Sequence, residues 1–95
     1  MTLEDYRQQM DQADEALVRA FCQRMETAAS IAAYKKEHGL PVLDSARERD
    51  KLRAVAEQAG PDLADYTTAL YSLLFELSRA SQGRLLGERS PLSEE

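Results

Sequence analysis

Residues 3–38, LEDYRQQMDQADEALVRAFCQRMETAASIAAYKKEH, decide the fold of this 95-residue chain. Two interleaved sets of mostly apolar side chains recur along the segment every seven residues: Leu3, Met10, Leu17, Arg24 and Ile31, and Tyr6, Ala13, Ala20, Thr27 and Tyr34. This heptad-like spacing predicts one continuous helix with a single apolar stripe. Gly39 and then Pro41 follow directly, so we expect the helix to end near His38.

The length of this helix predicts a dimer. At a rise of about 1.5 Å per residue the helix is roughly 50 Å long, whereas a compact monomer of this size has a radius of gyration of only about 12 Å. The rest of the chain is too short to cover such a helix. A homodimer in which two long helices cover each other is therefore the economical solution.

The remaining sequence predicts two further helices. Glycine and proline are confined to three short segments, and no alternating β-branched run that would form a strand lies between them. We expect helices at about residues 45–59 and 62–86, followed by a polar tail at 87–95. The predicted fold is a single all-α domain spanning residues 1–95, with three helices per chain and a very long first helix.

The composition is that of a soluble globular protein, with 43% hydrophobic and 31% charged residues. A net charge of −5 argues against nucleic-acid binding, so any anion site must be a local cluster of Arg and Lys. One cysteine and one histidine build neither a disulfide framework nor a metal site, and the single cysteine indicates a reducing cytoplasm. We expect no membrane span, because the sequence has no signal peptide and no long apolar run.

The segment PVLDSARERD, residues 41–50, has two interpretations. Ser45 and Glu48 have the spacing of a capping box, in which each side chain binds a backbone N–H at a helix start. Glu48 is also in phase with Leu52 and Val55, which turns it toward the buried face of the second helix. We expect both features: a helix start that also forms one wall of a polar site.

Cationic side chains of the long helix suggest an anion site. Arg24 takes a seam position of the apolar stripe, and Lys35 lies on the same face, roughly 16 Å further along the axis. The gap between them suits a small dianion, although a snorkelling Arg24 and a solvated Lys35 are simpler alternatives. Arg7 is roughly 42 Å from Lys35, so it can serve the same ligand only from the partner chain of an antiparallel dimer.

Ser78 and Gln82 continue the apolar stripe of the third helix as polar groups one turn apart. Ordinary hydrogen bonding between helices is the alternative explanation for both. The single histidine, His38, is expected at the surface, at the end of the first helix. Arg, Lys, Ser and Gln side chains beside an acid-rich helix start can orient and electrostatically stabilise a small polyanion without covalent chemistry.

Taken together, the sequence resembles the all-α chorismate mutases over about residues 3–86. The matching residues are spread over the long helix, the segment GLPVLDSARERD and the segment LSRASQ: Arg7, Arg24, Lys35, Asp44, Arg47, Glu48, Ser78 and Gln82. Each motif is weak by itself, whereas the ordered set at these spacings is specific.

The resemblance implies an intertwined homodimer that converts chorismate to prephenate in phenylalanine and tyrosine biosynthesis by the shikimate pathway. The reaction is an intramolecular pericyclic rearrangement, in which the side-chain ether C–O bond breaks as a new C–C bond forms. It implies neither cofactor nor metal. The enzyme has only to hold the compact diaxial conformer and to stabilise charge on the departing ether oxygen.

Carried over by position, the resemblance implies that the partner's Arg7 and the chain's own Arg24 bind the two substrate carboxylates. Lys35 bridges a carboxylate and the ether oxygen, and Gln82 donates a hydrogen bond to the same oxygen. Some relatives have glutamate at the Gln82 position, and that side chain must be protonated to donate. With glutamine here, we expect activity that does not need acidic pH.

The other matching residues are expected around the ring of the substrate. The resemblance implies that Glu48 accepts a hydrogen bond from the ring hydroxyl and that Ser78 lies near a ring carboxylate. Asp44 and Arg47 shape the hydroxyl end of the pocket. Arg79 follows Ser78, and its phase, about 60° from that of the glutamine, predicts a position at the surface or at an interface.

Other functions stay open. An isochorismate-pyruvate lyase shares this fold and much of the cationic pocket, but the hydroxyl-facing acids Asp44 and Glu48 favour the mutase over it and over a mutase of amino-substituted chorismate. A non-catalytic helical dimerisation module predicts that the polar site residues can become alanine with no effect beyond stability. Residues 89–95, RSPLSEE, suit a linker, so both a free-standing enzyme and a domain of a bifunctional chorismate mutase–prephenate dehydratase fit.

Overall fold

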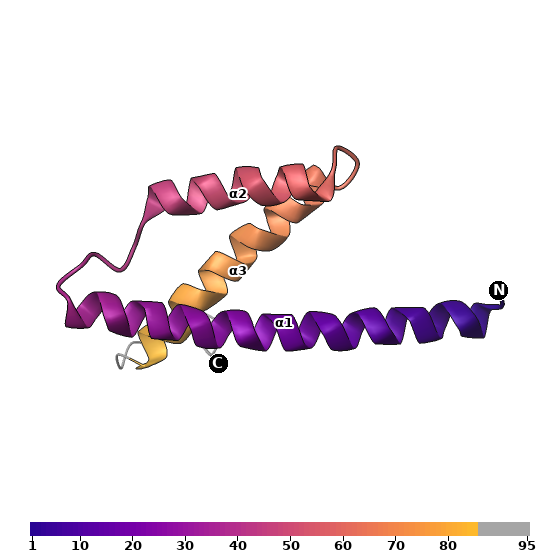
Figure 1. Ribbon diagram of the computed structural model, residues 1–95, viewed down its shortest axis with the longest axis horizontal. Coiled ribbons are helices and arrows are strands. Elements are labelled where there is room, and N and C mark those ends of the chain that lie inside the picture. The colour runs from indigo at the N-terminus through magenta and orange to yellow at the C-terminus, as the bar shows by residue number, and fades with distance from the viewer. Residues whose placement is uncertain (86–95) are drawn as a thin grey trace, which may run out of the picture.

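The computed structural model describes residues 1–85 as three helices joined by two short connections (Figure 1). The helices are α1 (Leu3–Glu37), α2 (Ser45–Ala59) and α3 (Ala64–Leu85). No strand occurs within the described residues, so the predicted all-α fold with a very long first helix is confirmed. The polar tail that the sequence predicts at residues 87–95 lies outside the described part of the chain.

Both ends of α1 are closed by hydrogen bonds of their own. Thr2 is the N-cap, and its side chain and that of Asp5 each accept from the other's backbone N–H, which forms a capping box that the sequence analysis missed. At the other end Gly39 takes a φ of 68°, and the N–H groups of Gly39 and Leu40 bond carbonyls of the last turn at 3.3 and 2.7 Å. This Schellman motif ends the helix at the exposed C-cap His38.

The start of α2 shows that the predicted Ser45–Glu48 capping box is wrong. Asp44 is the N-cap, and its Oδ1 atom accepts from the backbone N–H of Arg47 at 3.0 Å. Aspartate caps as well as serine, and its negative charge also interacts favourably with the helix N-terminus, so the cap moves one residue earlier. The side chain of Glu48 is thereby released from capping.

The connection between α2 and α3 is a tight turn at glycine. Gly60 is the C-cap of α2 and has a φ of 89°. Residues with a Cβ rarely adopt such a positive φ. Residues 61–63 form a turn in which the Leu63 N–H donates to the Gly60 carbonyl at 3.2 Å. Helix α3 therefore begins at Ala64, two residues later than the sequence predicts.

The helices are arranged around α3. It packs against both α1 and α2, whereas no Cα atom of α1 comes within 8 Å of one in α2. In Figure 1, α2 runs back in the opposite direction to α1 and apart from it, and α3 then slants back to cross the C-terminal half of α1. The N-terminal half of α1 projects past the other two helices, so the described chain is 54 Å long in its greatest dimension.

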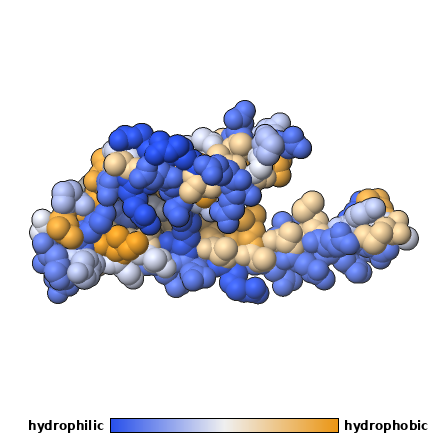
Figure 2. Space-filling model, turned by 45° about the horizontal axis from the view of Figure 1, so that its top comes forward, coloured by the Kyte–Doolittle hydropathy of each residue, from blue (hydrophilic) through white to orange (hydrophobic). Residues whose placement is uncertain are grey.

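Much apolar surface remains uncovered on the single chain. Val55 is the one buried hydrophobic side chain among the described residues, and α1 has no buried residue at all. Figure 2 shows apolar side chains exposed along the projecting half of α1. The large hydrophobic residues exposed on this half are Leu3, Tyr6, Met10, Leu17 and Val18. The apolar stripe that the heptad spacing predicts is therefore present on α1, but the other helices of the same chain leave its N-terminal half exposed to solvent.

Candidate active site

A cavity of 270 Å³ lies between the three helices. Its polar lining comes from all of them: Arg24 from α1, Glu48 from α2, and Ser78, Arg79 and Gln82 from α3. The rest of the lining is apolar and includes the loop before α2: Ala28, Ile31, Ala32, Val42, Leu43 and Phe75. Four of the residues that the sequence singled out thus converge on one space from distant parts of the chain.

Arg24 is held between α1 and α3 by aromatic rings. Its guanidinium carbon lies 5.1 Å from the ring centroid of Tyr71 and 5.6 Å from that of Phe75, which are distances typical of cation–π contacts. Its Nε atom is buried and has no hydrogen-bond partner within the described part of the chain. Buried polar groups are rarely left unpaired, so the unpaired N–H of a side chain that also lines the cavity calls for an explanation.

A second cavity, of 490 Å³, adjoins the first and shares the side chains of Arg24 and Glu48 with it. It adds two cations of α2, Arg47 and Lys51. Lys51 was not predicted, although it follows Glu48 by three residues and such spacing places two side chains on one helix face. Among the described residues that line the two cavities, Glu48 is the one acid. The site is therefore locally cationic in a chain whose net charge is −5.

An ion pair connects α2 and α3 across the first cavity. The Arg79 Nη1 atom donates to Glu48 Oε2 at 2.8 Å, and the two side chains are 48% and 31% exposed. Arg79 is exposed and pairs with another helix, as its phase predicts, and it also lines the same cavity as Gln82 despite the offset of about 60° between them. The reason is reach: the long arginine side chain spans the angular offset between the two positions. Their spacing of three residues was the available signal.

Ser78 and Gln82 join α3 to α1 as well as lining the cavity. Ser78 Oγ lies 3.8 Å from the Sδ atom of Met25, and Gln82 Nε2 donates to the carbonyl of Ala28 at 3.4 Å. Both contacts are long and therefore weak. The side-chain amide of Gln82 carries two donor hydrogens, so one remains for a ligand.

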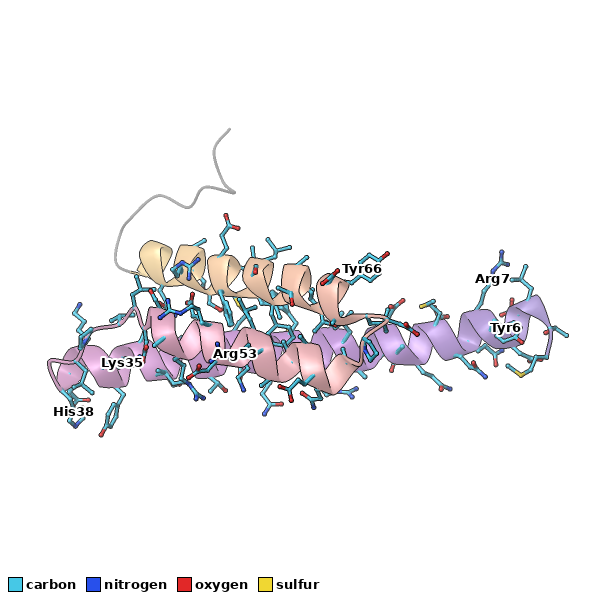
Figure 3. The ribbon with its side chains drawn as sticks, turned by 90° about the horizontal axis from the view of Figure 1, so that it is seen from above. Tyr6, Arg7, Lys35, His38, Arg53 and Tyr66 are labelled. Carbon is cyan, nitrogen blue, oxygen red and sulfur yellow. The ribbon has the colours of Figure 1, made fainter. Side chains whose placement is uncertain are left out.

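Three predicted site residues line neither cavity: Arg7, Lys35 and Asp44. The Lys35 Nζ atom donates to the carbonyl of Val42 at 3.3 Å, and Asp44 caps α2. Arg7 lies at the far end of α1 from Lys35 (Figure 3). The single chain therefore assembles five of the eight predicted residues: Arg24, Arg47, Glu48, Ser78 and Gln82.

The chemistry available in the cavities is that of charge and hydrogen bonding. Guanidinium, ammonium, amide, hydroxyl and carboxylate groups line them. Within residues 1–85 no group of three or more His, Cys, Asp or Glu side chains is placed to hold a metal ion. No helix in this part of the chain is both long enough and apolar enough to cross a membrane. The lining groups can orient a small anionic molecule and stabilise charge that develops on it.

Comparison with known proteins connects this site to a family. A family model described as chorismate mutase type II matches residues 6–83. The match includes every predicted site residue from Arg7 to Gln82. Comparisons with curated proteins and with solved structures return no significant match. On the strength of the family match, which covers most of its length, the chain belongs to the chorismate mutase type II family.

Proposed function

We propose that this protein is a chorismate mutase, an intramolecular isomerase that converts chorismate to prephenate in phenylalanine and tyrosine biosynthesis by the shikimate pathway. The observation that carries the proposal is the convergence of Arg24, Glu48, Ser78 and Gln82 on one cavity. Family membership over residues 6–83 supports the same activity.

The charges around the cavities suit this substrate. Chorismate carries two carboxylates, both ionised at neutral pH, and the adjoining cavities present Arg24, Arg47 and Lys51. A guanidinium binds a carboxylate with two parallel hydrogen bonds, and the unpaired Nε–H of Arg24 is one donor for such a pair. We assign Arg24 to a substrate carboxylate, with Ser78 beside the carboxylate on the ring.

The rearrangement needs positioning and charge stabilisation rather than a nucleophile. The apolar lining residues, among them Ile31 and Phe75, are proposed to pack against the substrate and hold it in the compact conformer. As the C–O bond breaks, negative charge develops on the ether oxygen. The free amide hydrogen of Gln82 is proposed to donate to that oxygen, and a donor held in place before the reaction stabilises the transition state most effectively.

The hydroxyl end of the substrate is assigned to Glu48, the one acid among the described lining residues. A carboxylate accepts hydrogen bonds and cannot donate them when ionised, which suits a ring hydroxyl. Asp44 is proposed to act less directly than its sequence position suggests. By capping α2 it sets where Arg47 and Glu48 stand in the first turn of that helix.

A second copy of the chain is proposed to complete each site. The uncovered apolar face on the projecting half of α1 is the surface expected between two intertwined chains. In such a homodimer Arg7 reaches the partner's site, which it cannot reach in its own chain. Lys35 is proposed to bridge a carboxylate and the ether oxygen after giving up its 3.3 Å bond to Val42, a residue that itself lines the cavity.

The second candidate is an isochorismate-pyruvate lyase, which uses the same fold and a similar cationic pocket. Glu48 in the cavity favours the mutase, because the resemblance to the mutases assigns an acid at this position to the ring hydroxyl of chorismate. The third candidate is a non-catalytic dimerisation module, which offers no ligand as hydrogen-bond acceptor for the unpaired Nε–H of Arg24. The single cysteine remains the argument for a cytoplasmic location.

The decisive assay follows the disappearance of chorismate with purified protein and identifies prephenate as the product. Isochorismate is offered in parallel, and release of pyruvate is measured. The Gln82→Ala variant is the control, because it removes the proposed donor to the ether oxygen. Prephenate formation that falls at least about 100-fold in this variant supports the proposal. Pyruvate release without prephenate formation would replace the mutase by the lyase, and inactivity on both substrates would favour the non-catalytic reading.

A further inference from the structure

We propose that Arg79 is a positioning residue that acts through Glu48. It neutralises this carboxylate and holds it so that one oxygen stays available to the ring hydroxyl of the substrate. The inference rests on the proposed mutase function, and it adds to the site a residue that lies outside the predicted set.

The geometry of the ion pair is the first observation. Arg79 Nη1 donates to Glu48 Oε2 at 2.8 Å, which is a good length for a charge-assisted hydrogen bond. A carboxylate has two oxygens that accept, so a bond to Oε2 leaves Oε1 for a second donor. Both side chains line the cavity that Gln82 also lines. Arg79 can therefore orient Glu48 without occupying the position that the hydroxyl needs.

The charge balance of the site is the second observation. Glu48 is the one acid among the described residues that line the two cavities, and an isolated carboxylate there repels a substrate that carries two negative charges. Paired with Arg79, it has no net charge at long range but keeps its ability to accept a hydrogen bond. The pair thus reconciles recognition of a hydroxyl with binding of a dianion.

The exposure of the pair is the third observation. Its side chains are 48% and 31% exposed, and ion pairs this open to solvent add little to stability. Asp50 and Arg53 form an ion pair within α2 that is more exposed, with side chains 68% and 73% exposed, and line neither cavity. Arg53 is therefore a control for the loss of an ion-paired arginine outside the cavities, and the melting temperature controls for the contact between helices that Arg79 alone makes.

The test measures kcat and KM for chorismate, together with the melting temperature, in the full-length protein. Arg79→Gln is expected to raise KM about tenfold and to change kcat less than about threefold, because the unpaired Glu48 repels the ground state and the transition state alike. Arg79→Lys restores the charge and is expected to keep KM within about threefold of the wild-type value. Arg53→Gln is expected to leave both constants unchanged.

A second pair of variants tests whether Arg79 acts through Glu48. In a Glu48→Gln background the Arg79→Gln change is expected to add no further rise in KM, because no carboxylate remains to be neutralised. The same rise in both backgrounds would make Arg79 a direct substrate ligand and overturn the inference. An unchanged KM in Arg79→Gln would also overturn the inference, and so would a variant whose one change is a lower melting temperature. Wild-type protein that leaves chorismate intact defeats the proposed function itself, whereas these outcomes in an active enzyme defeat the inference alone.

Discussion

The guanidinium carbon of Arg24 on α1 lies 5.1 Å from the ring centroid of Tyr71 on α3. This contact holds a charged side chain between α1 and α3, two helices that are separated along the chain by the whole of α2. Since α3 also carries Ser78 and Gln82, the position of Arg24 relative to both is set by one helix–helix contact. The proposed carboxylate ligand and the proposed ether-oxygen donor are therefore placed together.

Replacing Arg24 by lysine tests this arrangement. Lysine keeps the charge but loses the Nε–H and the planar fork of donors. We expect kcat/KM to fall at least about 100-fold, or about 2.7 kcal/mol in transition-state stabilisation, as measured by steady-state kinetics. Arg53→Lys, at an exposed position outside both cavities, is the control. Equal activity of the two variants would remove Arg24 from the site.

Mixing two inactive variants tests the shared site. Arg7→Ala and Lys35→Ala are each expected to be inactive as homodimers. After mixing, unfolding and refolding, a heterodimer has one site that carries both mutations and one that carries neither. Random pairing should therefore recover about a quarter of wild-type activity. Heterodimers that native mass spectrometry detects, but that show no activity, would place Arg7 outside the partner's site.

The pH profile tests the role of Gln82. Its amide does not titrate, so the wild-type enzyme is expected to keep most of its activity between pH 5 and 7.5. A glutamate at this position donates only when protonated, and its ordinary pKa is about 4.3. Gln82→Glu should therefore lose activity as pH rises across this range. Parallel profiles for the two proteins would show that the side chain does not donate in the rate-limiting step.

Substitutions of Asp44 separate capping from substrate contact. Asp44→Ala removes the acceptor for the Arg47 N–H and is expected to cost about 1 kcal/mol in the free energy of unfolding, measured by denaturant titration. Asp44→Ser keeps a capping oxygen and should restore most of that stability and most of the activity. A serine variant that is stable but inactive would show that the carboxylate itself contacts the substrate.

Much of the candidate site could be predicted because helical phase is a local property. Arg24 and Glu48 lie in phase with apolar neighbours, and the same spacing marks Ser78 and Gln82 on α3. All four line the first cavity. The phase of a residue is set by its number along a regular helix, so no knowledge of the neighbouring helices is needed.

The predictions from the sequence failed where the regular helix begins or where a side chain is long. Asp44 replaces Ser45 as the cap of α2 because two good capping residues stand side by side, and the capping box favoured the wrong one. Arg79 and Lys51 reach the cavities although neither was assigned to them, because several rotatable bonds carry the charge away from the direction of Cβ. Phase places the Cα–Cβ bond and not the end of such a side chain.

The sequence alone determined the three helices, the length of α1 and the face on which each polar residue stands, because all of these depend on spacing within one helix. Tertiary structure decided which faces meet. Packing of α3 against both α1 and α2 brought Arg24, Glu48 and Gln82 around one cavity, paired Glu48 with Arg79, and left Arg7 far away. Contacts between helices depend on crossing geometry and side-chain reach, which no periodicity within a single helix contains.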